Sequence, residues 1–167
     1  MLLRHLLSIL LLPFIVVVVV PWRILRPAGV PPARVMHSLG GGLRVALGAL
    51  LFVVGFAFFA WCVRLFARVG RGTLAPWDPT RALVAVGPYR HGRNPMISGV
   101  AMMLLGEAVL WSSRGLAVWA LCFLVINHLY FVFSEEPGLE RRFGQAYLAY
   151  KAHVPRWIPR LRPWSGA

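Results

Sequence analysis

The chain has 167 residues, of which 59% are hydrophobic and only 14% are charged. This length fits one domain, and so few charges argue against a soluble globular protein, which carries roughly 25% charged residues. In a soluble domain, the net charge of +13 would suggest a nucleic-acid partner. Here the basic residues gather with tryptophan at the ends of apolar runs, as in chains anchored at a bilayer surface. We therefore expect an all-α integral membrane protein with no nucleic-acid partner.

Four apolar runs approach the roughly 20 residues that a helix needs to cross a bilayer. They cover about residues 6–22, 45–66, 96–111 and 116–133. The first run is short and contains Pro13, and the third is short and contains Glu107. No small-residue cleavage site follows the first run, so we predict a retained helix rather than a signal peptide. The interpretation is a single membrane domain, residues 1–167, with about four transmembrane helices.

The distribution of basic residues predicts the orientation in the membrane. With four spans, thirteen of the 18 lysine and arginine residues fall on one side and five on the other. The positive-inside rule then places both termini and the loop of residues 67–95 in the cytoplasm. Four arginines in the first outer loop fit this topology poorly. A first segment that enters the membrane without crossing it is therefore an alternative.

Acidic residues are rare, with only five in the chain, so their positions are informative. Glu135 and Glu136 end the fourth apolar run, and Pro137 with Gly138 predicts that the helix ends there. Two carboxylates at a helix C-terminus repel each other and face the negative end of the helix dipole. An arginine or a ligand with hydrogen-bond donors should compensate them. The alternative is that both simply cap the next helix.

The segment of residues 138–152 is predicted to form an amphipathic helix on the cytoplasmic leaflet. Leu139, Phe143, Tyr147 and Tyr150 would share its apolar face, and prolines end the helix soon after. An aromatic stripe of this kind serves packing more often than it lines a pocket. The helix is therefore interpreted first as a membrane-surface element.

The loop before the third run ends in a clear helix start. Asn94 suits the N-cap position and Pro95 the first helical position. The free amides of such a start can bind an anion or a carbonyl oxygen. The Arg93–Asn94 start is therefore a candidate binding element.

A hairpin of the third and fourth runs would bring the polar groups together. With its turn at residues 112–115, Gly99 lies opposite His128 and Asn94 lies near Phe133. The absence of a side chain at Gly99 would let a bulky group approach the backbone. The helix start and the paired glutamates then meet at the cytoplasmic end beside an apolar cleft, with Asn127 as a further polar lining group. A small-molecule site needs such a convergence.

The ordered motifs resemble one known group. They are Gly87-Pro88-Tyr89-Arg90-x-x-Arg93-Asn94-Pro95-Met96-x-x-Gly99, then Glu135-Glu136-x-x-Leu139-x-x-x-Phe143-Gly144-x-x-Tyr147-x-x-Tyr150-x-x-x-Val154-Pro155-Arg156. Spaced around an apolar helix, they resemble the isoprenylcysteine carboxyl methyltransferase and phospholipid methyltransferase superfamily. The resemblance covers about residues 70–159 and includes bacterial members, which implies an integral protein of a bacterial inner membrane.

This resemblance implies a multi-helix membrane methyltransferase that uses S-adenosylmethionine on a small or lipid-like acceptor. The residues expected to bind the cofactor are Tyr89, Arg93, Asn94, Pro95, Met96, Gly99, Glu135 and Glu136. The residues expected to bind substrate are Arg141, Arg142, Asn127, His128 and Tyr147. No catalytic residue is assigned, and the candidates are Glu135 and Arg93. The histidines show no metal-ligand spacing, so we expect no metal.

Two departures from the family pattern concern the acceptor. Ile97 stands where tyrosine is common, and His91 stands where an aromatic residue is common. A prenylated cysteine carboxylate, a phospholipid amine, a small thiol and a quinone-like lipid all stay open, and so does the oligomeric state. Two other functions also stay open: a reductase-like relative that binds a nicotinamide cofactor, and a non-catalytic protein that binds anionic lipid. Glu107 is either a functional intramembrane acid or an interfacial acid that reaches water.

Overall fold

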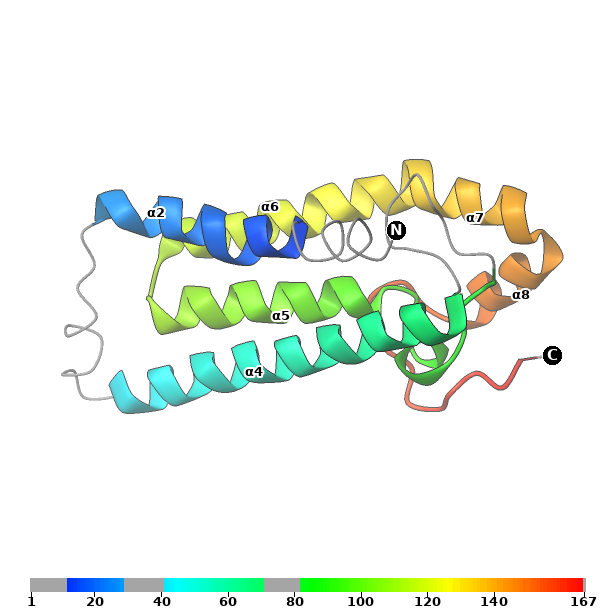
Figure 1. The fold of residues 1–167 in the computed structure, drawn as a ribbon, viewed down its shortest axis with the longest axis horizontal. Coiled ribbons are helices and arrows are strands. Elements are labelled where there is room, and N and C mark those ends of the chain that lie inside the picture. Colours follow the sequence, from blue (N-terminus) through cyan, green and yellow to red (C-terminus); the bar gives the residue numbers. More distant parts are fainter. Residues whose placement is uncertain (1–11, 29–40, 71–81, 167) are drawn as a thin grey trace.

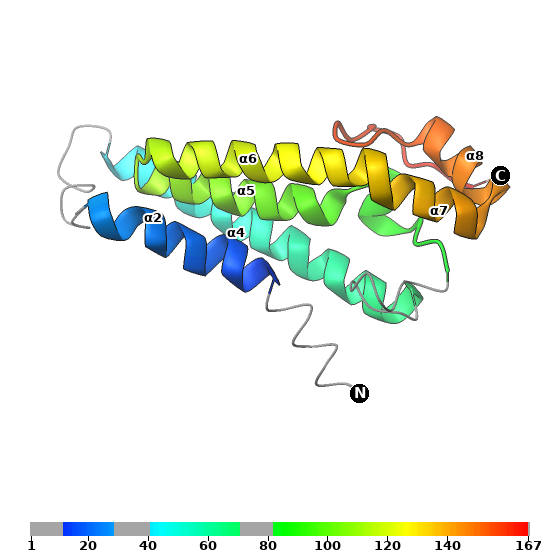
Figure 2. The same ribbon diagram turned by 90° about the horizontal axis from the view of Figure 1, so that it is seen from above.

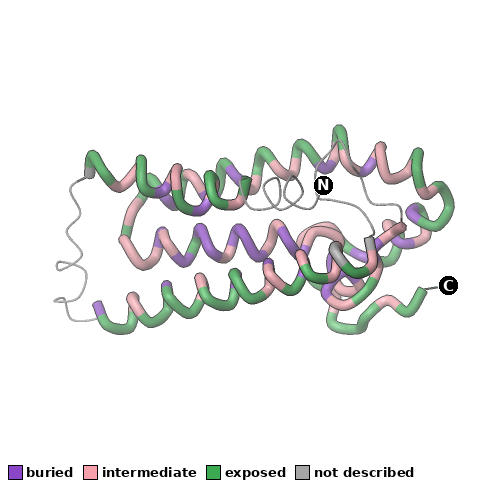
Figure 3. Tube along the Cα trace, viewed as in Figure 1, coloured by how far each residue is buried: buried purple, intermediate pink, exposed green. Residues whose placement is uncertain are grey.

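The computed structural model describes residues 12–28, 41–70 and 82–166, and every regular element within these ranges is a helix. The longest are α4 (Gly41–Leu65), α5 (Pro95–Leu110) and α6 (Arg114–Tyr130). They run side by side, with α5 between the other two (Figure 1). Figure 3 shows that buried residues concentrate on α5, whereas α4 and α6 turn many exposed residues outward. The all-α prediction is confirmed for the described residues.

The outward faces of the bundle are apolar. Large side chains such as Leu43 and Phe56 on α4, and Leu121 and Ile126 on α6, are exposed. Helix α4 and the helical stretch Arg114–Phe143 are each long and apolar enough to cross a membrane, while α5 is a shorter apolar helix. A surface of this composition suits acyl chains rather than water. The exact number of four spans stays a prediction.

The N-terminal helical stretch differs from the predicted first span. Residues 12–14, η1 (Ile15–Val19) and α2 (Val20–Ala28) form continuous helical turns that pass the predicted end at Trp22. The indole Nε1 of Trp119 donates a hydrogen bond to the carbonyl of Val16 (3.1 Å), which joins this stretch to α6. The predicted beginning of the first span, before residue 12, lies outside the described residues.

Two glycine pairs allow α4 and α5 to pack closely. A Cβ atom on Gly55 would lie 2.6 Å from the carbonyl oxygen of Gly99, and one on Gly106 would lie 2.7 Å from that of Gly48. Small residues at helix interfaces let backbones approach in this way. The expectation that Gly99 lies open opposite His128 is therefore wrong, because its missing side chain accommodates α4.

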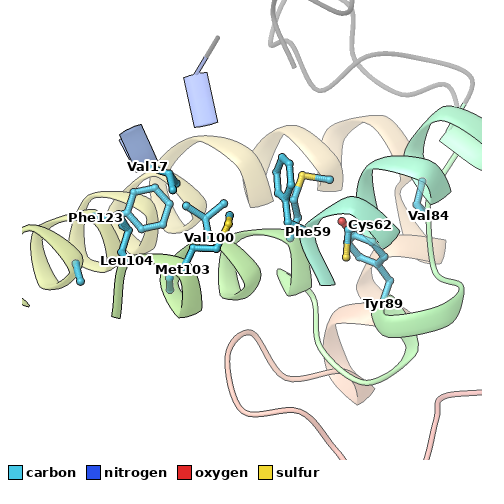
Figure 4. Close-up of a cluster of buried hydrophobic side chains, with 12 residues drawn as sticks. Val17, Phe59, Cys62, Val84, Tyr89, Val100, Met103, Leu104 and Phe123 are labelled. Atoms are coloured by element: carbon cyan, nitrogen blue, oxygen red, sulfur yellow. The ribbon is translucent and has the colours of Figure 1, made fainter. Parts of the chain in front are cut away.

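The core extends from the middle of the bundle toward the start of α5. Figure 4 shows Leu104 and Phe123 packed together in the middle, with Cys62 and Tyr89 near one end. The segment that contains Tyr89 includes the short helix η3 (Gly87–Arg90), while η2 (Phe66–Gly70) continues α4. The aromatic rings of Phe66 and Tyr89 lie 5.3 Å apart between centroids, so the loop before α5 is packed against the end of α4.

The fourth helix does not end at Pro137 as predicted. Helix α6 continues through the π-helical turn η4 (Phe131–Glu135) into α7 (Glu136–Phe143). Proline lacks an amide hydrogen, and its ring collides with the carbonyl four residues earlier in an α-helix. In the wider π turn, the amide of Glu136 bonds to the carbonyl of Phe131, five residues back. This turn lets the helix accommodate the proline.

The predicted interfacial helix of residues 138–152 is also wrong as a single element. Gly144 has φ +52° and separates α7 from α8 (Gln145–His153). The expected lipid-facing stripe instead packs inside the protein. Its members Tyr147 and Tyr150 form a small core with Val154, against which Leu83 and Trp164 pack.

Candidate functional site

The start of α5 and the end of the fourth helical stretch meet at one end of the bundle, called here the polar end. Nη1 of Arg93 lies 3.0 Å from Oε1 of Glu136. Nε of Arg156 donates to the same oxygen at 2.7 Å, and Nζ of Lys151 lies 3.3 Å from Oε2. These four residues form the Glu136 ion cluster. The predicted convergence of the helix start with the paired glutamates is thus confirmed.

Burial makes this ion cluster energetically important. Glu136 is only 5% exposed, and the Arg93 side chain is 11% exposed. A buried carboxylate needs charge partners, because desolvation of an unpaired charge is costly. Three cations drawn from three chain segments supply them. The sequence predicts a cationic partner for the glutamates, and Arg93 is such a partner of Glu136. Two further partners, Lys151 and Arg156, come from the C-terminal part of the chain.

The C-terminal strap, defined as residues 154–164, holds the loop that precedes α5. The amide of Arg93 donates to the carbonyl of Pro155 (2.9 Å), and the amide of Arg160 donates to that of His91 (2.9 Å). The amide of Trp164 donates to the carbonyl of Arg90 (3.0 Å). These bonds fix the backbone on which the Arg93 side chain stands.

Tyrosines complete the support of Arg93. Its Nη1 lies 3.5 Å from the hydroxyl of Tyr147, which places this predicted substrate residue at the ion cluster. The hydroxyl of Tyr150 donates to the carbonyl of Tyr89 (2.6 Å) and so joins α8 to the loop. Burial raises the pKa of both Tyr147 and Tyr150, because it disfavours the charged phenolate. Both hydroxyls therefore stay protonated at neutral pH.

Two cations of the cluster, Lys151 and Arg156, are stabilised in their charged forms by neighbouring carboxylates. The hydrogen bond to Glu136 raises the pKa of Arg156, and the hydrogen bond to Glu140 raises the pKa of Lys151. In each case the carboxylate stabilises the protonated form. The polar end therefore presents fixed positive charge around a single buried carboxylate.

Glu135 behaves differently from its neighbour. It is half-buried, and no described residue forms an ion pair or hydrogen bond with its carboxylate. Burial is the main cause that raises the pKa of Tyr89, and the charge of Glu135 acts in the same direction, so the two side chains are near each other. Among the described residues, Glu135 is therefore not joined to the Glu136 ion cluster by an ion pair or hydrogen bond.

The helix start forms where the sequence predicts it. Asn94 is the N-cap of α5 and Pro95 occupies the first turn, but the Asn94 side chain makes no capping hydrogen bond. The Ser98 hydroxyl instead donates to the Asn94 carbonyl (3.1 Å). The side-chain amide of Asn94 therefore does not cap its own helix. The Nε atom of Arg93 is buried and has no hydrogen-bond partner in the described part of the chain.

Three other predicted cofactor residues face the core instead. The Tyr89 ring is buried, and its hydroxyl shares a hydrogen bond with Cys62. Met96 is buried in the same cluster, and Gly99 faces α4. In this structure these residues position the loop and the start of α5 rather than line the polar end.

The remaining predicted substrate residues are spread around the polar end. Asn127 donates from Nδ2 to the carbonyl of Phe123 on its own helix (2.8 Å). Nδ1 of His128 accepts a hydrogen bond from the indole of Trp157 (3.1 Å). Arg141 and Arg142 are exposed on α7. Of the predicted substrate residues, Tyr147 contacts the ion cluster through Arg93.

Sequence reasoning gave no role to Lys151 or Arg156. Arg156 stands inside the quoted Val154-Pro155-Arg156 motif, and Lys151 is the only lysine in the chain. Either sequence feature could have identified these two residues as candidates. Their contact with Glu136 is seen only in the folded structure, where the strap returns to the polar end. Glu107, at the far end of α5, is half-buried with Oε2 buried and without a hydrogen-bond partner among described residues.

Comparison with known proteins gives one match. The family model described as phospholipid methyltransferase matches residues 43–146. No curated protein and no solved structure matches the chain. The matched range covers the start of α5 and both glutamates, whereas Lys151, Arg156 and the whole strap lie beyond it.

Proposed function

The chain belongs to the phospholipid methyltransferase family, and from this premise we propose that it transfers a methyl group from S-adenosylmethionine to a lipid-like acceptor at the polar end. The observation that carries the proposal is the contact between Arg93 and Glu136. It joins the two segments that the sequence predicts to bind the cofactor. Glu135 directly precedes Glu136 in the chain, and we propose that its carboxylate binds the cofactor.

The described residues fit the polar groups of S-adenosylmethionine. The Glu135 carboxylate can accept hydrogen bonds from ribose hydroxyls or from an ammonium group. The unpartnered Nε of Arg93 can donate to a carboxylate, and the Asn94 amide can donate and accept. Glu136 has the separate task of holding the three cations of its cluster in place.

When bound, S-adenosylmethionine would supply a methyl group attached to a sulfonium sulfur, which would leave as a neutral thioether when the acceptor takes the methyl group in line. The protein must orient the two reactants and exclude water, and orientation alone can supply several kcal/mol. Arg93 is held for this purpose by Glu136, Tyr147 and the strap. A carboxylate or thiolate acceptor needs no strong base, whereas an amine must first lose a proton, for which Glu135 is the candidate.

The acceptor is proposed to approach from the bilayer at the cytoplasmic leaflet. Exposed apolar residues, such as Leu129 on α6 and Phe133 on η4, offer a surface for its hydrocarbon portion. Arg141 and Arg142 on α7 can bind an anionic head group. Family membership favours methyl transfer over both the nicotinamide reductase and the non-catalytic lipid-binding alternatives.

The test is S-adenosylmethionine binding by calorimetry with purified protein in detergent. For Glu135→Gln we expect affinity to fall about tenfold or more, because a hydrogen bond to a charged group contributes about 1.5–3 kcal/mol. Asn94→Ala should weaken binding less. The matched control is Glu140→Gln, which removes a neighbouring carboxylate from a surface ion pair and should leave affinity unchanged.

Full affinity in both Glu135→Gln and Asn94→Ala would contradict the site assignment. Thermal unfolding of each variant shows whether any loss of binding reflects loss of fold. Incubation of the wild type with labelled S-adenosylmethionine and total membrane lipid then identifies the acceptor. Label in no lipid or small molecule, despite tight cofactor binding, would contradict the proposed transfer.

A further inference from the structure

The C-terminal strap presents two apolar side chains that the protein does not cover. Leu161 is 97% exposed and Ile158 is 82% exposed, the highest values among the large hydrophobic residues described. Full burial of such a side chain is worth about 1.5–3 kcal/mol. The strap also lies beyond the range matched by the family model.

The strap runs back beside a lipid-facing part of the bundle. The Trp157 indole donates to His128, and its ring centroid lies 5.7 Å from that of Phe131. Both partners belong to α6 and η4, next to exposed Leu129. Figure 2 shows α8 and the C-terminal segment at the same end of the molecule as α7. Ile158 therefore directly follows a residue that contacts the apolar helical stretch, while its own side chain is exposed.

The exposed side chains are held in place by the strap's backbone. Its amides bond to carbonyls of the loop before α5, and Nη1 of Arg160 donates to the carbonyl of His153 (2.8 Å). A fixed loop that presents aliphatic groups loses little conformational entropy when it enters a membrane. The strap therefore presents Ile158 and Leu161 on a backbone that is already fixed before it meets a partner.

The charge beside these side chains indicates the partner. Arg162 follows Leu161 directly, is exposed, and forms no ion pair or hydrogen bond with a described residue. Each arginine near an anionic leaflet contributes about 1 kcal/mol of attraction. An aliphatic pair with an adjacent cation, in a segment that contacts α6 through Trp157, complements a bilayer surface that contains anionic lipid.

We propose that residues 158–162 form a membrane-surface anchor, in which Ile158 and Leu161 insert into the leaflet at the polar end and Arg162 binds anionic head groups. The anchor replaces the amphipathic helix expected at residues 138–152, whose apolar face is buried in the protein. Because the strap holds the backbone of the Arg93 loop, binding of the anchor to lipid also orders that loop.

The test places a fluorescent label on the anchor of the full-length protein. Leu161→Cys or Ile158→Cys is made in a Cys122→Ser background, and Cys62 does not react because it is 0% exposed. The labelled protein is placed in nanodiscs of phosphatidylcholine, with or without phosphatidylglycerol. We expect emission at shorter wavelength and several-fold stronger quenching by acyl-chain spin labels than at the control, Gln145→Cys, an exposed position of α8.

Other outcomes would overturn the proposal. Water-like emission at both anchor positions in both lipids would exclude insertion, and equal quenching at position 145 would remove the assignment to the strap. Emission that shifts only when two copies share a nanodisc would indicate a contact between copies instead.

Arg162 and the ordering of the loop have their own measurement. We expect phosphatidylglycerol to slow hydrogen exchange at the amides of Arg93 and Arg160, and Arg162→Gln to abolish this slowing. Exchange that does not respond to phosphatidylglycerol in the wild type would overturn the head-group role.

Discussion

The two ends of the helical bundle each contain a carboxyl group, and the two groups differ in their charge partners. At the polar end, Glu136 is surrounded by three cations that come from the loop before α5, from α8 and from the strap. At the other end, Glu107 has a buried oxygen without a hydrogen-bond partner among the described residues. A short turn closes that end, where the Ser113 hydroxyl accepts from the amide of Leu116 and caps α6.

The two ends differ in the sequence separation of the residues that build them. The turn end is built by neighbours in sequence and needs only a local cap. The polar end requires segments up to several tens of residues apart to meet. The cations that they bring together compensate the desolvation of the buried Glu136 carboxylate. A cluster of this kind fixes the positions of the groups proposed to bind the cofactor, so we expect the two ends to respond differently to matched substitutions.

The largest expected effect is the loss of the Glu136 carboxylate. Glu136→Gln leaves three cations without their shared partner and should lower the free energy of unfolding by about 3 kcal/mol. This is the lower end of the usual range, because Lys151 and Arg156 reach solvent. Glu107→Gln removes no described partner and should be neutral or slightly stabilising. Thermal unfolding in detergent measures both variants.

Equal losses in the two variants would contradict the comparison of the ends. A stable Glu136→Gln protein would mean that the cations find enough compensation in Glu140 and solvent. Glu140→Gln provides the reference for the loss of a surface ion pair, which is worth about 0–1 kcal/mol.

The glycine pairs allow a second, smaller test. A Cβ on Gly99 would lie 2.9 Å from the carbonyl of Gly55, and one on Gly106 would lie 2.7 Å from that of Gly48. Because the colliding atoms are backbone, Gly99→Ala and Gly106→Ala should each cost about 1–3 kcal/mol of stability. Only Gly99→Ala, which displaces the start of α5, should also weaken S-adenosylmethionine binding.

Calorimetry on the two alanine variants separates these effects. Gly42→Ala is the control, because nothing lies within 4 Å of its added Cβ and alanine favours a helix. If Gly106→Ala weakened binding as much as Gly99→Ala, packing of the whole helix pair rather than its position at the polar end would govern the site.

The sequence predicts well what depends on local pattern. The apolar runs locate α4, α5 and α6 within a few residues, and Asn94–Pro95 marks the start of α5. The hairpin register also brings the helix start to the paired glutamates, because a short turn leaves two antiparallel helices little choice. These signals are local or follow from one turn.

The remaining features depend on contacts that no local pattern contains. Pro137 is a helix breaker by its chemistry, yet the π turn before it removes the conflict. Tyr147 and Tyr150 would suit a membrane surface equally well, and only the return of the strap makes them a core. The same return brings Lys151 and Arg156 to Glu136. Long-range packing therefore decides which polar residues reach the site.

The smallest expected effect concerns the attachment of α8 to the loop at the polar end. Tyr150→Phe removes the hydrogen bond to the Tyr89 carbonyl and should cost about 1 kcal/mol at pH 8. Burial raises the pKa of Tyr150 above its ordinary value of 10.0, so the fold favours the neutral phenol. This contribution is complete below the unfolded pKa and is lost as pH rises through the higher folded pKa. The stability of Tyr150→Phe should therefore decline less steeply than that of the wild type above pH 10.0.

Exposed Tyr130 serves as the control, because Tyr130→Phe should leave the alkaline decline unchanged. Parallel declines in all three proteins would mean that the Tyr150 hydroxyl does not hold the polar end together.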